Sequence, residues 1–338
     1  MRAIRVHAFG GPEELRLEEV ADPRAPAPGE VLVRMRAAGV NPFETYVRSG
    51  QYARLPELPY TPGVDGAGIV EAVGPASAPP VGAGRAAGGA AAIPAAPRPG
   101  DRVYTSGSIT GTYAELALCP AAEVHPLPAT LDFAAGAAIG VPYATAYRAL
   151  FQRGGAQQGQ LVLVRGASGG VGLATVQLAV TANLTVHGTA GSPTGRELVT
   201  AQGASRVVDH GAPGHTDELR EATGGRGYDL IVELAAHAGL GDDLDLLAPH
   251  GRVIVVGSRG PVEITPRDLM AREADIRGLL LWVAPSGEVV AAHEALRGGL
   301  ADGRLRPVVG RELPLSEASE AHRAVIAGPA AGKIVLIP

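Results

Sequence analysis

A glycine-rich turn is the part of this sequence whose residue types point most directly to a chemistry. Residues 160–165 read as a buried strand, residues 170–180 read as a helix, and the stretch Gly166-Ala167-Ser168-Gly169-Gly170-Val171-Gly172 joins them. Glycines let backbone amides approach a pyrophosphate, and the helix N-terminus adds unpaired N–H donors and a positive potential. This context predicts a dinucleotide site, although the glycine spacing differs from the usual fingerprint. The alternative is a tight turn that serves packing only.

The end of the second strand in this region indicates which dinucleotide is bound. NAD enzymes usually place Asp or Glu there to bind the ribose 2′-hydroxyl. Here the strand ends in His187-Gly188-Thr189, and the first acid after it is Glu197. A 2′-phosphate would meet no carboxylate and could pair with Arg196, with His210 and Lys333 as further candidates. The sequence therefore predicts NADPH over NADH, while Arg196 could instead be a solvated helix residue.

The cysteine and histidine content argues against a metal site. Cys119 is the single cysteine, which excludes an intrachain disulfide and any multi-thiolate zinc or iron–sulfur cluster. The nine histidines show no paired metal-ligand spacing. We therefore expect no metal.

The overall composition sets the frame for these residues. The chain has 338 residues, enough for two domains, and 46% of them are hydrophobic, as in globular proteins. A net charge of −5 gives no strong field for nucleic acid or an anionic membrane. The N-terminus lacks an apolar signal-peptide core, and no apolar run is long enough to span a bilayer, so we expect a cytoplasmic protein.

The first 132 residues are expected to form a mainly β domain, because short β-type segments alternate with Gly and Pro. The predicted strands cover residues 3–9, 30–38, 66–73, 101–106 and 113–118. Residues 75–100 are mostly Ala, Gly and Pro and predict a surface loop, with a functional lid as the alternative. Residues 304–338 end in the apolar run 333–337, which we expect to pair with the same domain.

Residues 133–303 show the alternation of strands and helices that is typical of a doubly wound parallel sheet. A first helix covers residues 133–151, with a kink or start near Pro142. The remaining strands are predicted at 184–189, 206–209, 229–234, 251–257 and 275–283, and the remaining helices at 193–202, 216–222, 240–247 and 288–301.

Several blocks of this sequence resemble the zeta-crystallin type of NADPH:quinone oxidoreductase, in the zinc-independent branch of the medium-chain dehydrogenase/reductase superfamily. The blocks are residues 38–50 with Tyr52, and residues 59–63, 136–143, 166–172 and 251–260. The resemblance runs essentially end to end and implies a Rossmann domain, a mainly β GroES-like catalytic domain, NADPH, a quinone substrate and a homodimer. Where zinc relatives have Cys and His ligands, this chain carries Asn41 and Val64, neither of which is a good zinc ligand.

The resemblance also implies the residues that bind the coenzyme. They are Tyr46; Ser168, Gly169, Gly170 and Val171 at the pyrophosphate; Gly188 and His210 near the adenosine half; His237, Ile254, Val255, Val256 and Gly257 further along; and Arg277, Gly278 and Leu279 over the nicotinamide. The family has Asn where this chain has His237, so that contact depends on the histidine tautomer. Asn183 replaces a glycine after the first Rossmann helix and tolerates the left-handed conformation.

Hydride transfer to a quinone places negative charge on the acceptor oxygen, which polar donors can stabilise. Tyr46, Tyr52 and Asn41 are the candidate catalytic residues, in a cleft expected between the β domain and the carboxyl ends of the parallel strands. Tyr52 could instead be an ordinary loop aromatic, and Asn41 a turn former before Pro42. The sequence does not decide between transfer of a hydride and transfer of single electrons to the quinone.

Two other functions compete with quinone reduction. The same scaffold and coenzyme could serve an enoyl or alkenal reductase that acts on conjugated enones. Some zeta-crystallin relatives bind RNA, but the negative net charge and the few aromatic residues argue against RNA binding here. The apolar strand expected at 275–283 would form a sheet edge suited to pairing in a homodimer.

Overall fold

The computed structural model describes residues 1–75, 96–328 and 331–338. The chain divides into two compact units. Unit 1 comprises Met1–Gly140, Glu312–Ile326 and Ile334–Pro338, and unit 2 comprises Val141–Arg311 and Ala327–Lys333. The domain boundaries predicted after residues 132 and 303 lie somewhat earlier in the chain than the unit boundaries at Gly140 and Arg311. Most of the Ala/Gly/Pro segment 75–100, and with it the predicted surface loop, lies outside the described residues.

Unit 1 is built around a sheet of seven strands. The strand order is β14-β15-β3-β4-β5-β7, and β6 also pairs with β3. Its strands are β3 (Glu30–Val40), β4 (Asp65–Val73), β5 (Arg102–Thr105), β6 (Leu116–Pro120), β7 (Val124–Pro126), β14 (Val309–Pro314) and β15 (Lys333–Ile337). A separate pair is formed by β1 (Arg2–Arg5) and β2 (Arg16–Glu19). Every second residue at the start of β3 is buried, and Val31, Val33 and Met35 join one core cluster.

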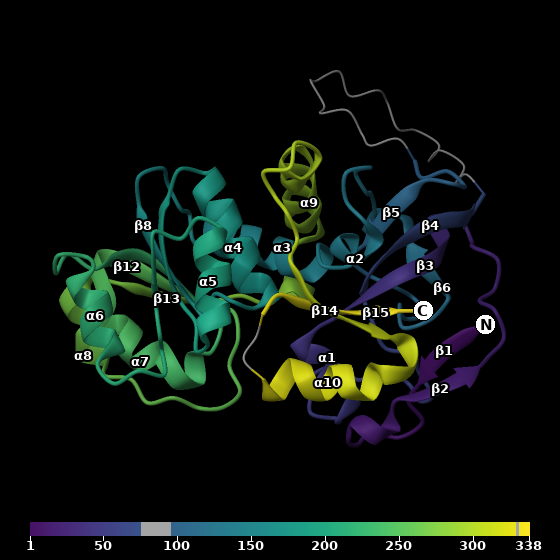
Figure 1. Cartoon of the computed structure of the whole chain (residues 1–338), viewed down its shortest axis with the longest axis horizontal. Helices are drawn as coiled ribbons and strands as arrows, with labels where there is room; N and C mark the ends of the chain where they lie inside the picture. The colour runs from purple at the N-terminus through teal and green to yellow at the C-terminus, as the bar shows by residue number, and fades with distance from the viewer. Residues whose placement is uncertain (76–95, 329–330) are drawn as a thin grey trace. The chain divides into compact units, whose positions relative to one another are not determined.

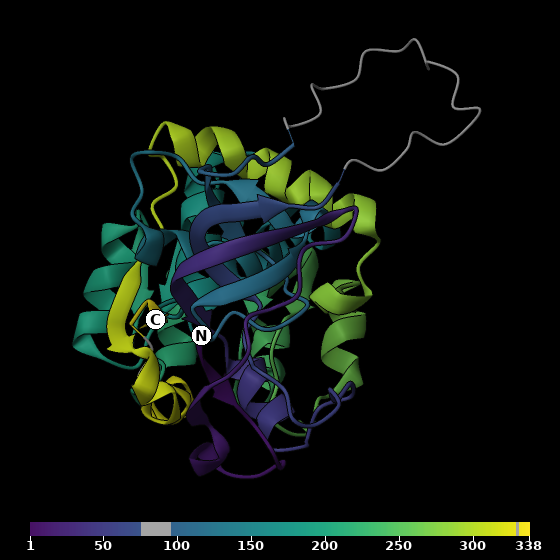
Figure 2. The same cartoon turned by 90° about the vertical axis from the view of Figure 1, so that its right-hand side faces the viewer.

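The last strand joins the first part of the chain, as the apolar tail predicts. Ile334, Val335 and Leu336 of β15 pair antiparallel with Val40, Gly39 and Ala38 of β3. Figures 1 and 2 show the two chain ends side by side in this unit. Helices α1 (Pro42–Arg48), α2 (Phe133–Gly136) and α10 (Ala318–Ala327) complete it.

Unit 2 is a doubly wound parallel sheet, and this prediction is confirmed. The strand order is β10-β9-β8-β11-β12-β13, and each neighbouring pair is parallel. The strands are β8 (Leu161–Arg165), β9 (Thr185–Thr189), β10 (Arg206–Val208), β11 (Tyr228–Glu233), β12 (Leu247–Val255) and β13 (Asp275–Gly278). The order reverses at β8, so the carboxyl end of β8 is the topological switch point where such sheets bind ligands.

Helices cover both faces of this sheet. Figure 1 shows α4 and α5 on one side and α6, α7 and α8 on the other. The helices are α3 (Gly140–Tyr147), α4 (Gly170–Thr181), α5 (Pro193–Ala201), α6 (His215–Glu221), α7 (Ala236–Leu246), α8 (Pro266–Arg272) and α9 (Ser286–Ala301). Asn183 follows α4 with φ +58°, so the expected left-handed conformation is confirmed.

Several predicted elements differ from the structure. The strand expected at 3–9 ends at Arg5, and the helix expected at 240–247 begins earlier, at Ala236. The helix expected at 133–151 breaks after α2, before Pro142, and continues as α3 and a π-helical segment, Arg148–Arg153. The strand expected at 275–283 is wrong beyond Gly278, because its partner β12 ends at Val255, opposite Gly278, and a 3-10 turn follows at Leu281–Val283. The strand expected at 113–118 starts only at Leu116.

Helix α1 was not expected, because residues 1–132 were read as strands and turns. It begins at Pro42 directly after Asn41, and the Asn41 and Glu44 side chains form a reciprocal capping box. The spacing of Asn41 and Glu44, with Pro42 between them, is the sequence signal that could have revealed it.

Candidate coenzyme and acceptor sites

The glycine turn of unit 2 is fixed to the end of β9. Gly166 has φ +70°, a backbone conformation that favours glycine. The N–H of Gly166 donates to Thr189 Oγ1 over 3.0 Å, and the N–H of Ala167 donates to the Thr189 carbonyl over 2.8 Å. The turn therefore has one defined position at the carboxyl edge of the sheet.

Two glycines around the turn leave no room for a Cβ atom. A Cβ on Gly172 would lie 2.6 Å from three backbone atoms of Ala167, and a Cβ on Gly188 would lie 2.9 Å from the Val199 side chain. Close contact at Gly172 brings the first turn of α4 against Ala167 of the glycine turn. The residue before α4, Gly169, is extended and makes no side-chain cap hydrogen bond. The first N–H groups of α4 are thus suited to an anionic ligand, and the turn fits a dinucleotide pyrophosphate.

Lys333 lies beside this turn although it is distant in sequence. The N–H of Gly332 donates to the Ser168 carbonyl over 2.8 Å. A Cβ on Gly170 would lie 3.6 Å from Cδ of Lys333. The structure therefore brings together Ser168, Gly170 and Lys333, which the sequence predicted as coenzyme residues.

Two of the three residues predicted for the 2′-phosphate, Arg196 and His210, lie around the ends of β9 and β10, whereas Lys333 lies beside the glycine turn. His210 Nδ1 lies 3.3 Å from Thr189 Oγ1, and Arg196 forms an ion pair of 2.6 Å with Asp209. Hydrogen bonding by the Gly211 N–H and the charge of Arg196 hold the pKa of Asp209 below its usual value. Sequence reasoning missed this carboxylate, which directly follows β10 rather than β9. A 2′-phosphate would have to compete with Asp209 for Arg196.

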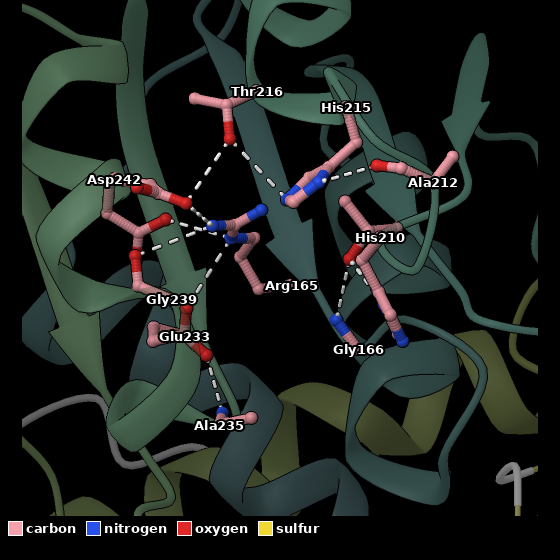
Figure 3. Close-up of polar contacts among 12 residues, drawn as sticks. Arg165, Gly166, His210, Ala212, His215, Thr216, Glu233, Ala235, Gly239 and Asp242 are labelled. Carbon is pink, nitrogen blue, oxygen red and sulfur yellow. Dashed lines mark hydrogen bonds and ion pairs between the residues drawn. The ribbon is translucent and has the colours of Figure 1, made fainter.

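A buried charged cluster lies directly behind the glycine turn. Arg165, the last residue of β8, is opposite Glu233, the last residue of β11. Arg165 Nε lies 2.9 Å from Asp243 Oδ1 and 3.6 Å from Glu233 Oε2. The side-chain exposures are 6% for Arg165, 1% for Glu233 and 0% for Asp243. Figure 3 shows Arg165 pointing toward Asp242 and Gly239. One guanidinium therefore faces two fully buried carboxyl groups.

This cluster connects two turns that are predicted to hold the coenzyme. Arg165 precedes Gly166, and Glu233 Oε1 accepts the N–H of Ala235 in the turn before α7. A Cβ on Gly239 would lie 2.5 Å from Glu233 Oε2, so α7 approaches the cluster through a glycine. Burial, together with the neighbouring Glu233, raises the pKa of Asp243 well above its usual value. Sequence reasoning did not identify these three residues.

The remaining coenzyme residues lie at the carboxyl ends of β11, β12 and β13. His237 Nδ1 accepts the N–H of Arg259 over 3.2 Å, so in the neutral ring Nε2 carries the proton and can donate. The N–H of Val256 donates to the Glu233 carbonyl, and the N–H of Leu279 to the Val255 carbonyl. Arg277 is different, because its guanidinium binds Asp275 and the Arg153 carbonyl.

In unit 1, Asn41 is held by two buried carboxylates. Its Nδ2 lies 3.0 Å from Asp65 Oδ2 and 3.4 Å from Glu44 Oε1. Glu44 also accepts the Tyr113 hydroxyl over 2.7 Å, and His322 lies 3.3 Å from the same hydroxyl. Burial lowers the pKa of His322 to about 3. Both amide hydrogens of Asn41 point to carboxylates, which favours its role as turn former over that of donor to an acceptor oxygen.

We expect Asn41→Ala to lower the free energy of unfolding by about 1–3 kcal/mol, because Asp65 and Glu44 would each lose a donor in a buried site. Urea unfolding of the two proteins measures this change. A variant that unfolds like the parent but turns over more slowly would instead identify Asn41 as a catalytic donor.

The two predicted tyrosines lie at the end of helix α1 and after it. Tyr46 is half-buried on α1, and its carbonyl accepts the N–H of Gln51 over 2.8 Å. The Tyr52 ring lies 5.9 Å from that of Phe43. Phe43 lines a cavity of about 540 Å³ that is formed by unit 1 alone. Tyr52 therefore lies beside a residue of the cavity wall but does not itself line the cavity.

The described residues include neither a group of metal ligands nor a reactive thiol. Within residues 1–75, 96–328 and 331–338, no three His, Cys, Asp or Glu side chains are grouped as metal ligands would be. Cys119 is buried, and burial raises the pKa of its thiol to about 12, so it is not a reactive thiolate. None of the described helices is both long enough and apolar enough to cross a membrane.

Comparison with known proteins gives the same two-part organisation. Residues 27–129 match the alcohol dehydrogenase GroES-like domain, and residues 170–295 match the zinc-binding dehydrogenase family. The human quinone oxidoreductase is 46% identical over 338 residues, covering all of this chain and 98% of that protein. The Lama guanicoe quinone oxidoreductase is 45% identical, covering all of this chain and 97% of that protein.

Solved structures show the same fold. An NAD-dependent alcohol dehydrogenase superposes with a TM-score of 0.87 at 30% identity, covering all of both chains. The Escherichia coli quinone oxidoreductase complexed with NADPH superposes with a TM-score of 0.83 at 28% identity, again over both full chains.

Proposed function

This chain belongs to the zeta-crystallin-like quinone oxidoreductases of the medium-chain dehydrogenase/reductase superfamily, and we propose that it reduces quinones with NADPH without a metal ion. The observation that carries the proposal is the glycine turn at the switch point of the sheet, in a chain 46% identical to a quinone oxidoreductase over its full length. Asn41 and Val64 stand where zinc relatives have ligands, which supports the metal-free part.

The residues of unit 2 fit a nicotinamide dinucleotide. When bound, the coenzyme supplies the hydride. The first N–H groups of α4 and the ammonium of Lys333 hold the pyrophosphate, since Gly170 and Lys333 lie at the same point of the turn. Arg196 and His210 bind the 2′-phosphate. His237 donates from Nε2, because its Nδ1 is already an acceptor.

The residues of unit 1 supply the acceptor site. Tyr46 and Tyr52 donate to the acceptor oxygen on which charge develops, and the cavity next to Phe43 takes the ring system. Asn41 contributes by holding the start of α1 through Glu44 and Asp65. A quinone is already electrophilic, so these residues have to position it and exclude water rather than activate it.

The decisive test is an NADPH-oxidation assay over ortho-quinones, para-quinones and conjugated enones, with NADH alongside. We expect the highest kcat/KM with a quinone and NADPH. Higher values with enones would identify an enoyl or alkenal reductase on the same scaffold. No oxidation with any of these acceptors would overturn the proposal.

Arg196→Gln tests the choice of coenzyme. A charge-assisted contact to phosphate contributes roughly 1.5–3 kcal/mol, so we expect the KM for NADPH to rise about tenfold or more. The KM for NADH should not change. Arg206→Gln is the matched control, because Arg206 is exposed and pairs with Glu218. Asp209→Asn should act in the opposite direction, because it releases Arg196 from its ion pair. An equal change with both coenzymes would contradict the assignment.

We further propose a homodimer formed through the edge of the unit 2 sheet. β13 ends the strand order, and the large apolar residues Leu280 and Val283 are exposed in the segment that follows it. Such an edge favours pairing across a two-fold axis. Sedimentation should give twice the mass of the chain, and Val283→Glu should give the monomer. A parent protein that sediments as a monomer would contradict this.

A further inference from the structure

The cavity of unit 1 carries a positive charge that quinone reduction does not by itself require. Its wall includes the apolar side chains of Phe43, Val47, Leu55, Tyr60 and Ile109. Two guanidinium groups, those of Arg5 and Arg54, belong to the same wall.

The acid in this wall does not balance the two arginines. Glu44 is the acid among the lining residues. It is buried, and its carboxylate accepts hydrogen bonds from the Asn41 amide and the Tyr113 hydroxyl. The charge of Glu44 is therefore directed into the core of unit 1, and the wall keeps a net positive side.

The two arginines are placed differently. Arg5 is fixed, because its Nη2 donates to the Pro59 carbonyl over 2.8 Å and its Nη1 to Thr61 Oγ1 over 3.3 Å. Arg54 is exposed on the loop after α1, and within the described part of the chain no acidic side chain pairs with it. Its guanidinium keeps its hydrogen-bond donors for a ligand, and five donors in a planar fork suit a sulfonate or carboxylate.

We propose that Arg54, with Arg5 in the wall of the same cavity, makes this cavity selective for aromatic acceptors that carry an anionic substituent. The proposal rests on quinone reduction as the function and names the acceptor class that the cavity prefers. The apolar side chains contact the ring system, and the anionic group meets Arg54. Arg54 is thus a specificity-determining residue for acceptors.

Steady-state kinetics of Arg54→Gln with NADPH tests the proposal. Menadione is the neutral acceptor, and a naphthoquinone sulfonate is the anionic one. Each acceptor is compared only with itself across variants, so its reduction potential cancels. We expect kcat/KM for the sulfonate to fall about tenfold, equivalent to about 1.4 kcal/mol. The value for menadione should change much less, and the effect on the sulfonate should shrink at about 0.5 M salt, because ions screen an exposed charge.

Arg36→Gln is the matched control, because Arg36 is exposed on β3 and does not line the cavity. It should leave both acceptors unchanged. An equal effect of Arg54→Gln on the two acceptors, or none on the sulfonate, would overturn the proposal.

A second readout separates this proposal from the proposed function. Naphthalene-2-sulfonate cannot accept a hydride, so equilibrium dialysis reports its binding without turnover. We expect binding that weakens about tenfold in Arg54→Gln and stays unchanged in Arg36→Gln. Loss of all quinone turnover with this binding pattern intact would overturn quinone reduction alone. Turnover without it would overturn the selectivity alone.

Discussion

Arg165→Met is expected to lower the free energy of unfolding by about 3–5 kcal/mol, the cost of removing one partner from a buried ion pair. Methionine can fill much of the space of the arginine stem, so the loss is mainly one of charge. Glu233 and Asp243 would then face each other in the core with no cation between them. Because Arg165 precedes Gly166, we also expect weaker NADPH binding. Urea unfolding and coenzyme titration measure the two effects.

Asp243→Asn is the informative companion to Arg165→Met. It removes the surplus acid and leaves the pair of Arg165 and Glu233, so we expect a change within about 1 kcal/mol at neutral pH. Combined with Arg165→Met, it should recover part of the lost stability, because a single buried carboxyl group remains. A double variant no more stable than Arg165→Met would contradict the charge count of one guanidinium for two carboxyl groups.

The same cluster gives stability a pH dependence of defined sign. The folded pKa of Asp243 is raised by burial and by Glu233, although Arg165 opposes this. The stabilisation by the protonated carboxyl is complete below the unfolded pKa, near 3.9. It is lost as the pH rises through the raised folded value. Asp243→Asn should therefore lose less stability than the parent over that interval, as measured by urea unfolding at a series of pH values.

The second large effect is expected from substitutions at two glycines of the turn. One substitution should lower the stability of the fold, and the other should weaken only NADPH binding. Gly172→Val should lower the free energy of unfolding by about 1–3 kcal/mol, because the Cβ of the valine would lie 2.6 Å from backbone atoms of Ala167. Backbone cannot move aside as a flexible side chain can. The turn would shift, and NADPH binding would be lost with it.

Gly170→Ala is the matched case, because its Cβ would make ordinary contacts of 3.5 Å with Pro142 and 3.6 Å with Lys333. The protein without coenzyme should unfold like the parent. NADPH should bind at least about tenfold more weakly, since the methyl group would stand where the pyrophosphate approaches the helix. Calorimetry measures this affinity. Normal NADPH affinity in Gly170→Ala would show that the turn serves packing only.

The parallel sheet of unit 2 could be predicted because its signal is local. Each strand is a short apolar run and each helix follows within a few residues, so composition and spacing define the alternation. The glycine turn is local in the same sense, since its conformation depends on residues 166–172. The predicted end of β13 at residue 283 was wrong because the length of a strand depends on its partner. The partner strand β12 stops at Val255, opposite Gly278.

The roles of single polar residues could not be predicted in the same way. Asn41 looked like a donor to substrate, but the carboxylates that take its amide hydrogens include Asp65, 24 residues away in sequence. Arg196 looked available to a phosphate, but it pairs with Asp209, which directly follows the neighbouring strand β10. A hydrogen bond depends on distance in space, and sequence spacing gives that only within one element.

The sequence by itself determined the family, the doubly wound sheet and the position of the dinucleotide turn, because these follow from local patterns of apolar residues and glycine. The tertiary structure alone decided which charges are neutralised. It brought together Arg165, Glu233 and Asp243, which come from three different elements. It also left Arg54 in a cavity wall without an acidic partner among the described residues. The energy of a charge depends on its burial and its neighbours in space, and both arise only when the chain is folded.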